Sequence, residues 1–294
     1  MVSKYTSFWH KQAYLAVGFF AAVPLVVSTA IAPAQAHGTH GDDTEYYIGL
    51  DGLQVLTSGT YAGLENPNYN RLTFLYAHWS ENPVSNHFHG IGAYSYLGAV
   101  DSPSINSTNL NNRIPEISTG MPPLKLIPGT GIYAHRLISF DTHEEYSNLN
   151  IKPVTSLAGS SEIEDEYLFN SSRGRWQSAL TGATIGIQLL EISSGLNIAN
   201  EGGENILTFI GDIYTLGSGD DFSFTPTFWT EKTATPGTYS ATFKLVDLSN
   251  NYLESGRFSL DFRVEKVPEP STTIALGLGG LLALSISHLK KRTA

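Results

Sequence analysis

The sequence predicts an all-β fold of sandwich-like antiparallel sheets, set between an N-terminal signal peptide and a C-terminal sorting helix. Many short segments alternate apolar and polar residues or carry β-branched and aromatic side chains, and Gly, Pro and Asn separate them. No long window repeats with the helical period. Many short strands without alternating helices are typical of a sandwich or barrel.

Seven segments between the two ends are expected to be strands, and the stretch 160–180 is expected to hold at most a short helix. The seven segments are 71–79, 93–100, 184–192, 205–214, 221–229, 237–247 and 256–266.

The first 36 residues have the order of a secretory signal peptide. Lys4 and Lys11 precede a long apolar run that ends in Ala34-Gln35-Ala36. A basic segment, an apolar segment and small residues at an A-x-A site are the parts of an exported leader. Cleavage after Ala36 would make His37 the first residue of the mature chain, and the alternative is an uncleaved membrane anchor.

The last residues combine a Pro-Glu-Pro triplet at 268–270, an apolar stretch at about 272–287 and the basic cluster 290–292. The apolar stretch is slightly shorter than the ~20 residues of a comfortable membrane span, and the basic cluster would stay in the cytoplasm. This order resembles the PEP-CTERM sorting tail. The resemblance implies transient membrane anchoring through the C-terminal helix, processing by an exosortase near the triplet, and a final place at the cell surface or in the extracellular matrix. A plain C-terminal anchor is the alternative.

The body between the two ends is acidic and lacks cysteine. The ends contain five of the 17 Lys and Arg residues and one of the 27 Asp and Glu residues, which leaves 12 against 26 and a net charge of −14. Such a body suits cations and is a poor match for nucleic acid. With no cysteine in the chain, disulfides and thiolate zinc sites are excluded, so a transition metal would need imidazole and carboxylate ligands.

The body changes in composition near residues 145–160, because seven histidines lie between 37 and 143 and none lies between 144 and 287. We therefore expect a signal peptide (1–36), a histidine-containing β region (37–150), a β-sandwich-like region (151–266) and a sorting tail (267–294). The seam could also be a loop within one sandwich.

The second half resembles the repeats of bacterial surface-anchored proteins found near metal-uptake genes. The resemblance rests on "IGIQLLEISSGLNIA", on an aromatic strand and on the turn Pro236-Gly237-Thr238-Tyr239. The chain has Ser223-Phe224-Thr225 where that family commonly has His-x-His, which puts a metal role for this strand in doubt. With its tail and its histidines, the whole chain resembles a cyanobacterial PEP-CTERM family placed under the zinc-uptake repressor Zur.

The strongest metal-binding signal is "HFHG", in which His87 and His89 flank Phe88. If residues 86–91 form a strand, both imidazoles lie on one face and could share one ion. A third ligand must then come from elsewhere: His78 or His135 from a strand-like segment, or His143 from a loop. His37 and His40, in an acidic segment, are further candidates. Each of these histidines could also be an ordinary structural or solvated residue.

Imidazole suits both zinc and copper, and the resemblance favours zinc. We expect an exported, surface-anchored zinc-binding protein that aids zinc acquisition or storage under zinc limitation. Its metal affinity should fall below about pH 6, because imidazole must be neutral to bind. No G-x-S-x-G, H-E-x-x-H or Gly-rich phosphate loop is present, so an enzyme is not expected. The alternatives are a structural or adhesive matrix protein and, behind it, a zinc- or copper-dependent extracellular enzyme.

Overall fold

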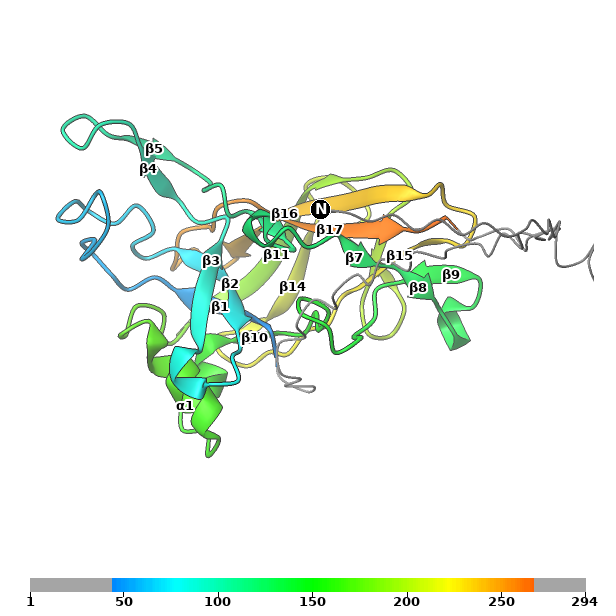
Figure 1. The fold of residues 1–294 in the computed structure, drawn as a ribbon, viewed down its shortest axis with the longest axis horizontal. Helices are drawn as coiled ribbons and strands as arrows, with labels where there is room; N and C mark the ends of the chain where they lie inside the picture. Colours follow the sequence, from blue (N-terminus) through cyan, green and yellow to red (C-terminus); the bar gives the residue numbers. More distant parts are fainter. Residues whose placement is uncertain (1–43, 267–294) are drawn as a thin grey trace, which may run out of the picture. The chain divides into compact units, whose positions relative to one another are not determined.

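The computed structural model describes residues 44–266, and the expected signal peptide and sorting tail lie outside these residues. The described chain folds as four sheets with little helix, which confirms the all-β prediction (Figure 1). No helix within the described range is long and apolar enough to cross a membrane.

The first sheet has the strand order β10-β1-β2-β3. Strand β2 pairs antiparallel with β1 on one side and with β3 on the other, while β10 pairs parallel with β1. The strands are β1 (Tyr46–Leu50), β2 (Leu72–His78), β3 (His87–Ile91) and β10 (Ile151–Pro153).

A larger sheet, in the order β14-β11-β16-β17-β6 with β7 also paired to β17, packs against the first. Its long strands are antiparallel, and its two parallel pairings, of β6 and β7 with β17, are short. It consists of β6 (Arg113–Ile114), β7 (Leu124–Lys125), β11 (Thr184–Ile192), β14 (Ile213–Ser218), β16 (Gly237–Asp247) and β17 (Phe258–Val264).

A third sheet has the order β13-β12-β15-β9-β8, and β4 and β5 form a separate hairpin. The strands of the third sheet are β8 (Ile127–Pro128), β9 (Arg136–Ile138), β12 (Asn197–Ala199), β13 (Asn205–Ile206) and β15 (Thr227–Glu231). The hairpin consists of β4 (Ser95–Leu97) and β5 (Ser104–Asn106).

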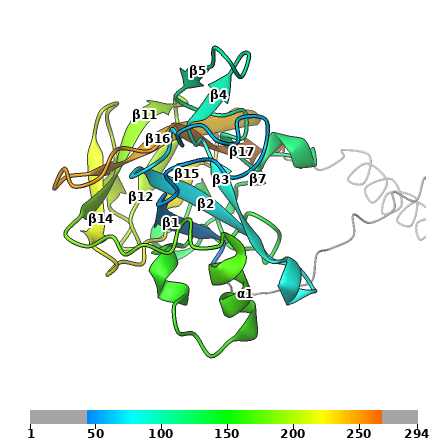
Figure 2. The same ribbon diagram turned by 90° about the vertical axis from the view of Figure 1, so that its left-hand side faces the viewer.

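The short helix expected within 160–180 is α1 (Ile163–Ser171). Both views place α1 and the β4–β5 hairpin on opposite sides of the β1-β2-β3 sheet (Figures 1 and 2). Four single-turn 3₁₀ helices complete the fold: η1 (Pro83–Ser85), η2 (Ile117–Thr119), η3 (Gly131–Tyr133) and η4 (Val154–Leu157).

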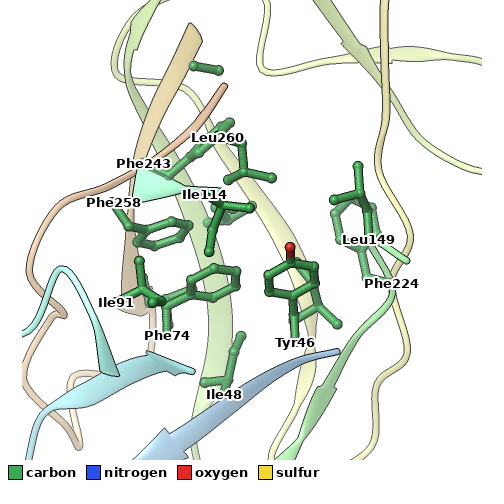
Figure 3. Packing of buried hydrophobic residues seen from close by; sticks show 14 of the residues in the cluster. Tyr46, Ile48, Phe74, Ile91, Ile114, Leu149, Phe224, Phe243, Phe258 and Leu260 are labelled. Atoms are coloured by element: carbon green, nitrogen blue, oxygen red, sulfur yellow. The ribbon is translucent and has the colours of Figure 1, made fainter. Parts of the chain in front are cut away.

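The main core lies between the sheets and draws side chains from both halves of the chain. Phe74 of β2 stacks on Phe258 of β17 at 4.0 Å (Figure 3). Phe228 of β15 stacks on Phe262 of β17 at 4.4 Å. Leu149 and Ile151, at the composition change, are buried in the same cluster. The residues on either side of the expected seam therefore share one core.

The strand predictions differ in how closely the structure follows them. Segments 71–79, 184–192, 237–247 and 256–266 each contain one long strand. Segment 205–214 breaks into β13 and the start of β14, because the Asp212 carboxylate accepts the N–H of Phe209 in a tight turn. In segment 221–229 the strand begins only at Thr227, after Pro226, which has no N–H to donate.

Candidate metal site

Strands β2 and β3 bring three of the predicted histidines together at one end of the first sheet. His78 is the register partner of His87, and Tyr76 is the partner of His89. The ring centroids are 4.7 Å apart for His87 and His89, 5.0 Å for His78 and His87, and 5.7 Å for His78 and His89, whose rings are parallel. We call these residues the three-histidine cluster.

The alternation of side chains along both strands explains why the imidazoles share a face. On β2, Phe74 and Tyr76 point into the main core, and His78 continues the same side of the strand. On β3, Ile91 belongs to the same core, while Phe88 packs on the opposite face against Tyr47. The cluster therefore lies where the core-facing side of the sheet reaches solvent.

Both histidines of "HFHG" have their Nδ1 atoms fixed by an acceptor. His87 Nδ1 lies 2.8 Å from the Ser85 carbonyl oxygen, and His89 Nδ1 lies 2.7 Å from Glu116 Oε2. Because a carbonyl and a carboxylate only accept, each Nδ1 must carry a proton and donate it. The Nε2 atoms are then the atoms through which the two rings would coordinate a cation. They face each other at 2.8 Å.

Glu116 is the buried carboxylate behind this pair, only 2% exposed. Its side chain accepts hydrogen bonds from His89, from Asn111 Nδ2 at 2.5 Å and from the Tyr146 hydroxyl at 3.1 Å. In the described part of the chain its ion-pair partner is His89, and no lysine or arginine pairs with it. Burial tends to raise the pKa of Glu116, but these hydrogen bonds outweigh burial and hold it below its usual range.

The same contact acts on the imidazole. The hydrogen bond to Glu116 raises the pKa of His89 above its ordinary value, against the opposing effect of burial. With both Nδ1 atoms protonated, a hydrogen bond between the two Nε2 atoms needs one additional proton. The pair of rings is therefore arranged to hold one positive charge between its Nε2 atoms, next to an ionised carboxylate.

A second group of acidic and tyrosine side chains adjoins the cluster. The Tyr76 hydroxyl donates to Glu145 Oε1 at 3.1 Å, and the Tyr76 ring lies edge-on to His89. Burial raises the pKa of Glu45 to about 8, although backbone N–H groups of Asn148 and Tyr146 lower it and the Asp141 and Glu145 carboxylates raise it further. Of this group, Glu145 acts on the cluster, because its charge also raises the pKa of His89, whereas the raised pKa of Glu45 keeps that side chain mostly protonated at neutral pH.

The other predicted histidines lie apart from the cluster or outside the described residues. His135 is exposed immediately before β9, a strand of another sheet, and has a positive φ of 73°. His143 is in a loop with a side chain 59% exposed, and its Nδ1 lies 3.8 Å from Asp141 Oδ1. His37 and His40 precede residue 44, where the description begins.

Within residues 44–266, no group of three or more His, Cys, Asp or Glu side chains is arranged to hold a metal ion. At the cluster, the His87 and His89 Nε2 atoms are only 2.8 Å apart. Two nitrogens that share a tetrahedral zinc at ~2.0–2.1 Å are about 3.3 Å apart, so His87 and His89 would have to separate by about 0.5 Å.

Sequence reasoning did not identify Glu116, Tyr146 or the Ser85 carbonyl as parts of this site. Glu116 is 27 positions from His89, and it reaches the site from the loop that follows β6. No local spacing signals such a contact. No family model, curated protein or solved structure matches this chain.

Proposed function

We propose that this protein is an exported, surface-anchored protein that binds zinc through His78, His87 and His89 and aids zinc acquisition or storage when zinc is scarce. The observation that carries the proposal is the facing pair of Nε2 atoms, each on a ring whose Nδ1 is already engaged by an acceptor. Metal-ligating histidines usually donate their second ring N–H to a carboxylate or a carbonyl in this way.

The charges at the site also favour a divalent cation. Glu116 is a buried anion whose partner in the described chain is an imidazole, so a zinc ion on His89 would replace the proton as its counter-charge. His78, whose ring stacks parallel to His89, is close enough to turn a nitrogen toward the same ion. Three imidazoles would leave the fourth position of tetrahedral zinc open, as exchangeable sites do.

The remaining parts of the proposal rest on the sequence. Export rests on the signal-peptide pattern, surface anchoring on the PEP-CTERM resemblance, and zinc rather than copper on the resemblance to the family under the zinc-uptake repressor. The net charge of the body would draw cations to the surface.

The test is zinc content and affinity of the purified protein beside a His87→Ala/His89→Ala double variant. We expect one zinc per chain with sub-micromolar affinity in the parent and loss of binding in the variant. The matched control, His135→Ala/His143→Ala, removes two histidines away from the cluster and should bind as the parent does.

Either of two results would reject the metal site: no zinc in the parent, or equal binding in both double variants. A structural or adhesive matrix protein would then be the better interpretation. A parallel titration with Cu²⁺ tests for selectivity: copper binding no tighter than zinc would mark a site selective for zinc, whereas tighter copper binding is what any generic imidazole site shows.

A further inference from the structure

A cleft of about 620 Å³ lies on another part of the molecule, between the loop after β1 and the turn after α1. One wall comes from residues 52–58 and the other from residues 172–176. Its volume falls in the range of small-molecule sites, about 300–1,000 Å³. No residue of the three-histidine cluster lines this cleft.

The two walls are held in place by a buried ion pair. Arg175 donates through Nε at 2.9 Å and Nη2 at 2.6 Å to Oδ2 of Asp51, whose side chain is 0% exposed. Asp51 Oδ1 also accepts the N–H of Leu53, and the N–H of Gly52 donates to the Arg175 carbonyl. The cleft is thus preformed, because the same contacts fix both walls.

The charge in the cleft is opposite to that of the protein. Its charged lining residues are Arg173 and Arg175, and no carboxylate lines it, although the whole chain has 27 acidic and 17 basic residues. Asp51 neutralises Arg175, whereas the exposed Arg173 makes no ion pair within the described residues. The cleft therefore has one uncompensated guanidinium.

The rest of the lining is hydroxyl and apolar. Thr57, Ser58 and Ser172 supply hydroxyl groups, and Ser172 Oγ is buried without a hydrogen-bond partner in the described chain. Trp176 is 8% exposed, and its Nε1 is likewise unpartnered among the described residues. These two atoms are buried and do not face the open cleft, so the hydroxyl groups that a ligand can reach are those of the exposed Thr57 and Ser58.

We propose that this cleft binds a hydroxyl-rich monocarboxylate, namely a sugar acid or the uronate unit of an oligosaccharide. The guanidinium of Arg173 would pair with the carboxylate, and the hydroxyls of Thr57 and Ser58 on the opposite wall would bond the hydroxyls of the ring. A phosphate dianion fits poorly, because the adjacent end of α1 is its C-terminus, which carries about half a negative charge. The positive charge of Arg173 exceeds the partial negative charge at the C-terminus of α1 by only about half a unit. This small positive charge suits a ligand with a single negative charge.

The test uses the full protein in the presence of a chelator, so that zinc cannot bridge to the carboxylates. Binding of a galacturonate trimer is measured by calorimetry beside the uncharged galactose trimer and inorganic phosphate. We expect saturable binding of the galacturonate trimer and at least tenfold weaker binding of the other two.

Two variants assign that binding to the cleft. Arg173→Gln should weaken galacturonate binding at least tenfold, while Lys232→Gln, which removes an exposed positive charge outside the cleft, should leave it unchanged. The melting temperatures of both variants are compared with that of the parent. A lower melting temperature in Arg173→Gln alone would mean that Arg173 stabilises the C-terminal end of α1. The proposal is overturned if the parent does not bind the galacturonate trimer, if phosphate binds as tightly, or if Arg173→Gln binds as the parent does.

Discussion

Glu116 does not bind the proposed zinc ion itself, but the site depends on it because it holds the ligand His89. In Glu116→Gln the side chain keeps its size and can still accept a hydrogen bond from His89, but the buried negative charge is lost. Loss of such a supporting group commonly weakens metal binding about 10–100-fold. We expect a zinc affinity lower by that factor, measured by competition with a chelator, and a His89 pKa closer to its ordinary value in an NMR titration.

A milder change at the same contact provides the control. Tyr146→Phe removes one of the three hydrogen bonds to Glu116 and leaves the carboxylate charge in place. Its zinc affinity should fall by less than that of Glu116→Gln. Equal affinity of Glu116→Gln and the parent would show that Glu116 has a structural role and does not support the metal.

At the scale of elements, the two faces of strand β3 have different roles: one face carries the proposed zinc ligands, and the other packs into a buried cluster. Phe88 points away from the histidines and packs between Tyr47 at 5.6 Å and Trp176 at 6.0 Å. Phe88→Ala should lower the free energy of unfolding by about 3 kcal/mol, because it leaves a cavity in a buried cluster. His87→Ala, which leaves the pair of His89 and Glu116 in place, should lose zinc with a much smaller loss of stability in the metal-free protein.

Urea unfolding of metal-free protein measures both changes. If His87→Ala loses as much stability as Phe88→Ala, the His87 imidazole is part of the packed structure, and its role as an open ligand is wrong. Zinc binding with the parent's affinity by Phe88→Ala, measured at a temperature low enough for the variant to be folded, would show that the two faces act separately.

The same two strands show what local sequence can and cannot predict. Alternation on β3 predicts that His87 and His89 share a face, since that depends only on the period of a strand. The sequence could not choose between His78 and His135 as the third histidine, because the choice depends on which strand pairs with β3. Glu116 was beyond prediction for a similar reason, since a loop contact over 27 positions leaves no periodic signal.

For the whole molecule, the composition and the alternation of residues predict the fold class. They do not predict that the two halves of the chain share one core. The histidine-rich first half and the histidine-free second half look different in sequence, yet Phe74 and Phe258 stack in one core. Burial responds to apolar volume and not to histidine content. A change in polar composition along a chain is therefore weak evidence of a structural boundary.

The whole molecule should lose stability as the pH rises from about 5.5 to 8. The pKa of Glu45 is raised from 4.5 to about 8 in the fold, so in this window the folded state keeps a proton that the unfolded chain has released. The pKa of His89 is also raised, and its contribution is present below about 6.5 and is lost as the pH rises through the folded value. Both groups act in the same direction, and a single group contributes at most about 1.4 kcal/mol per pH unit.

Thermal unfolding in a chelating buffer from pH 5.5 to 8 measures this dependence without interference from metal. We expect the melting temperature to fall steadily across the window, and Glu45→Gln, which resembles the protonated acid at every pH, to reduce the slope. Glu116 acts in the opposite direction, but its lowered pKa places that effect below about pH 4.5, outside the window. A melting temperature that stays level or rises toward pH 8 would mean that Glu45 is ionised in the fold, held by the N–H groups of Tyr146 and Asn148.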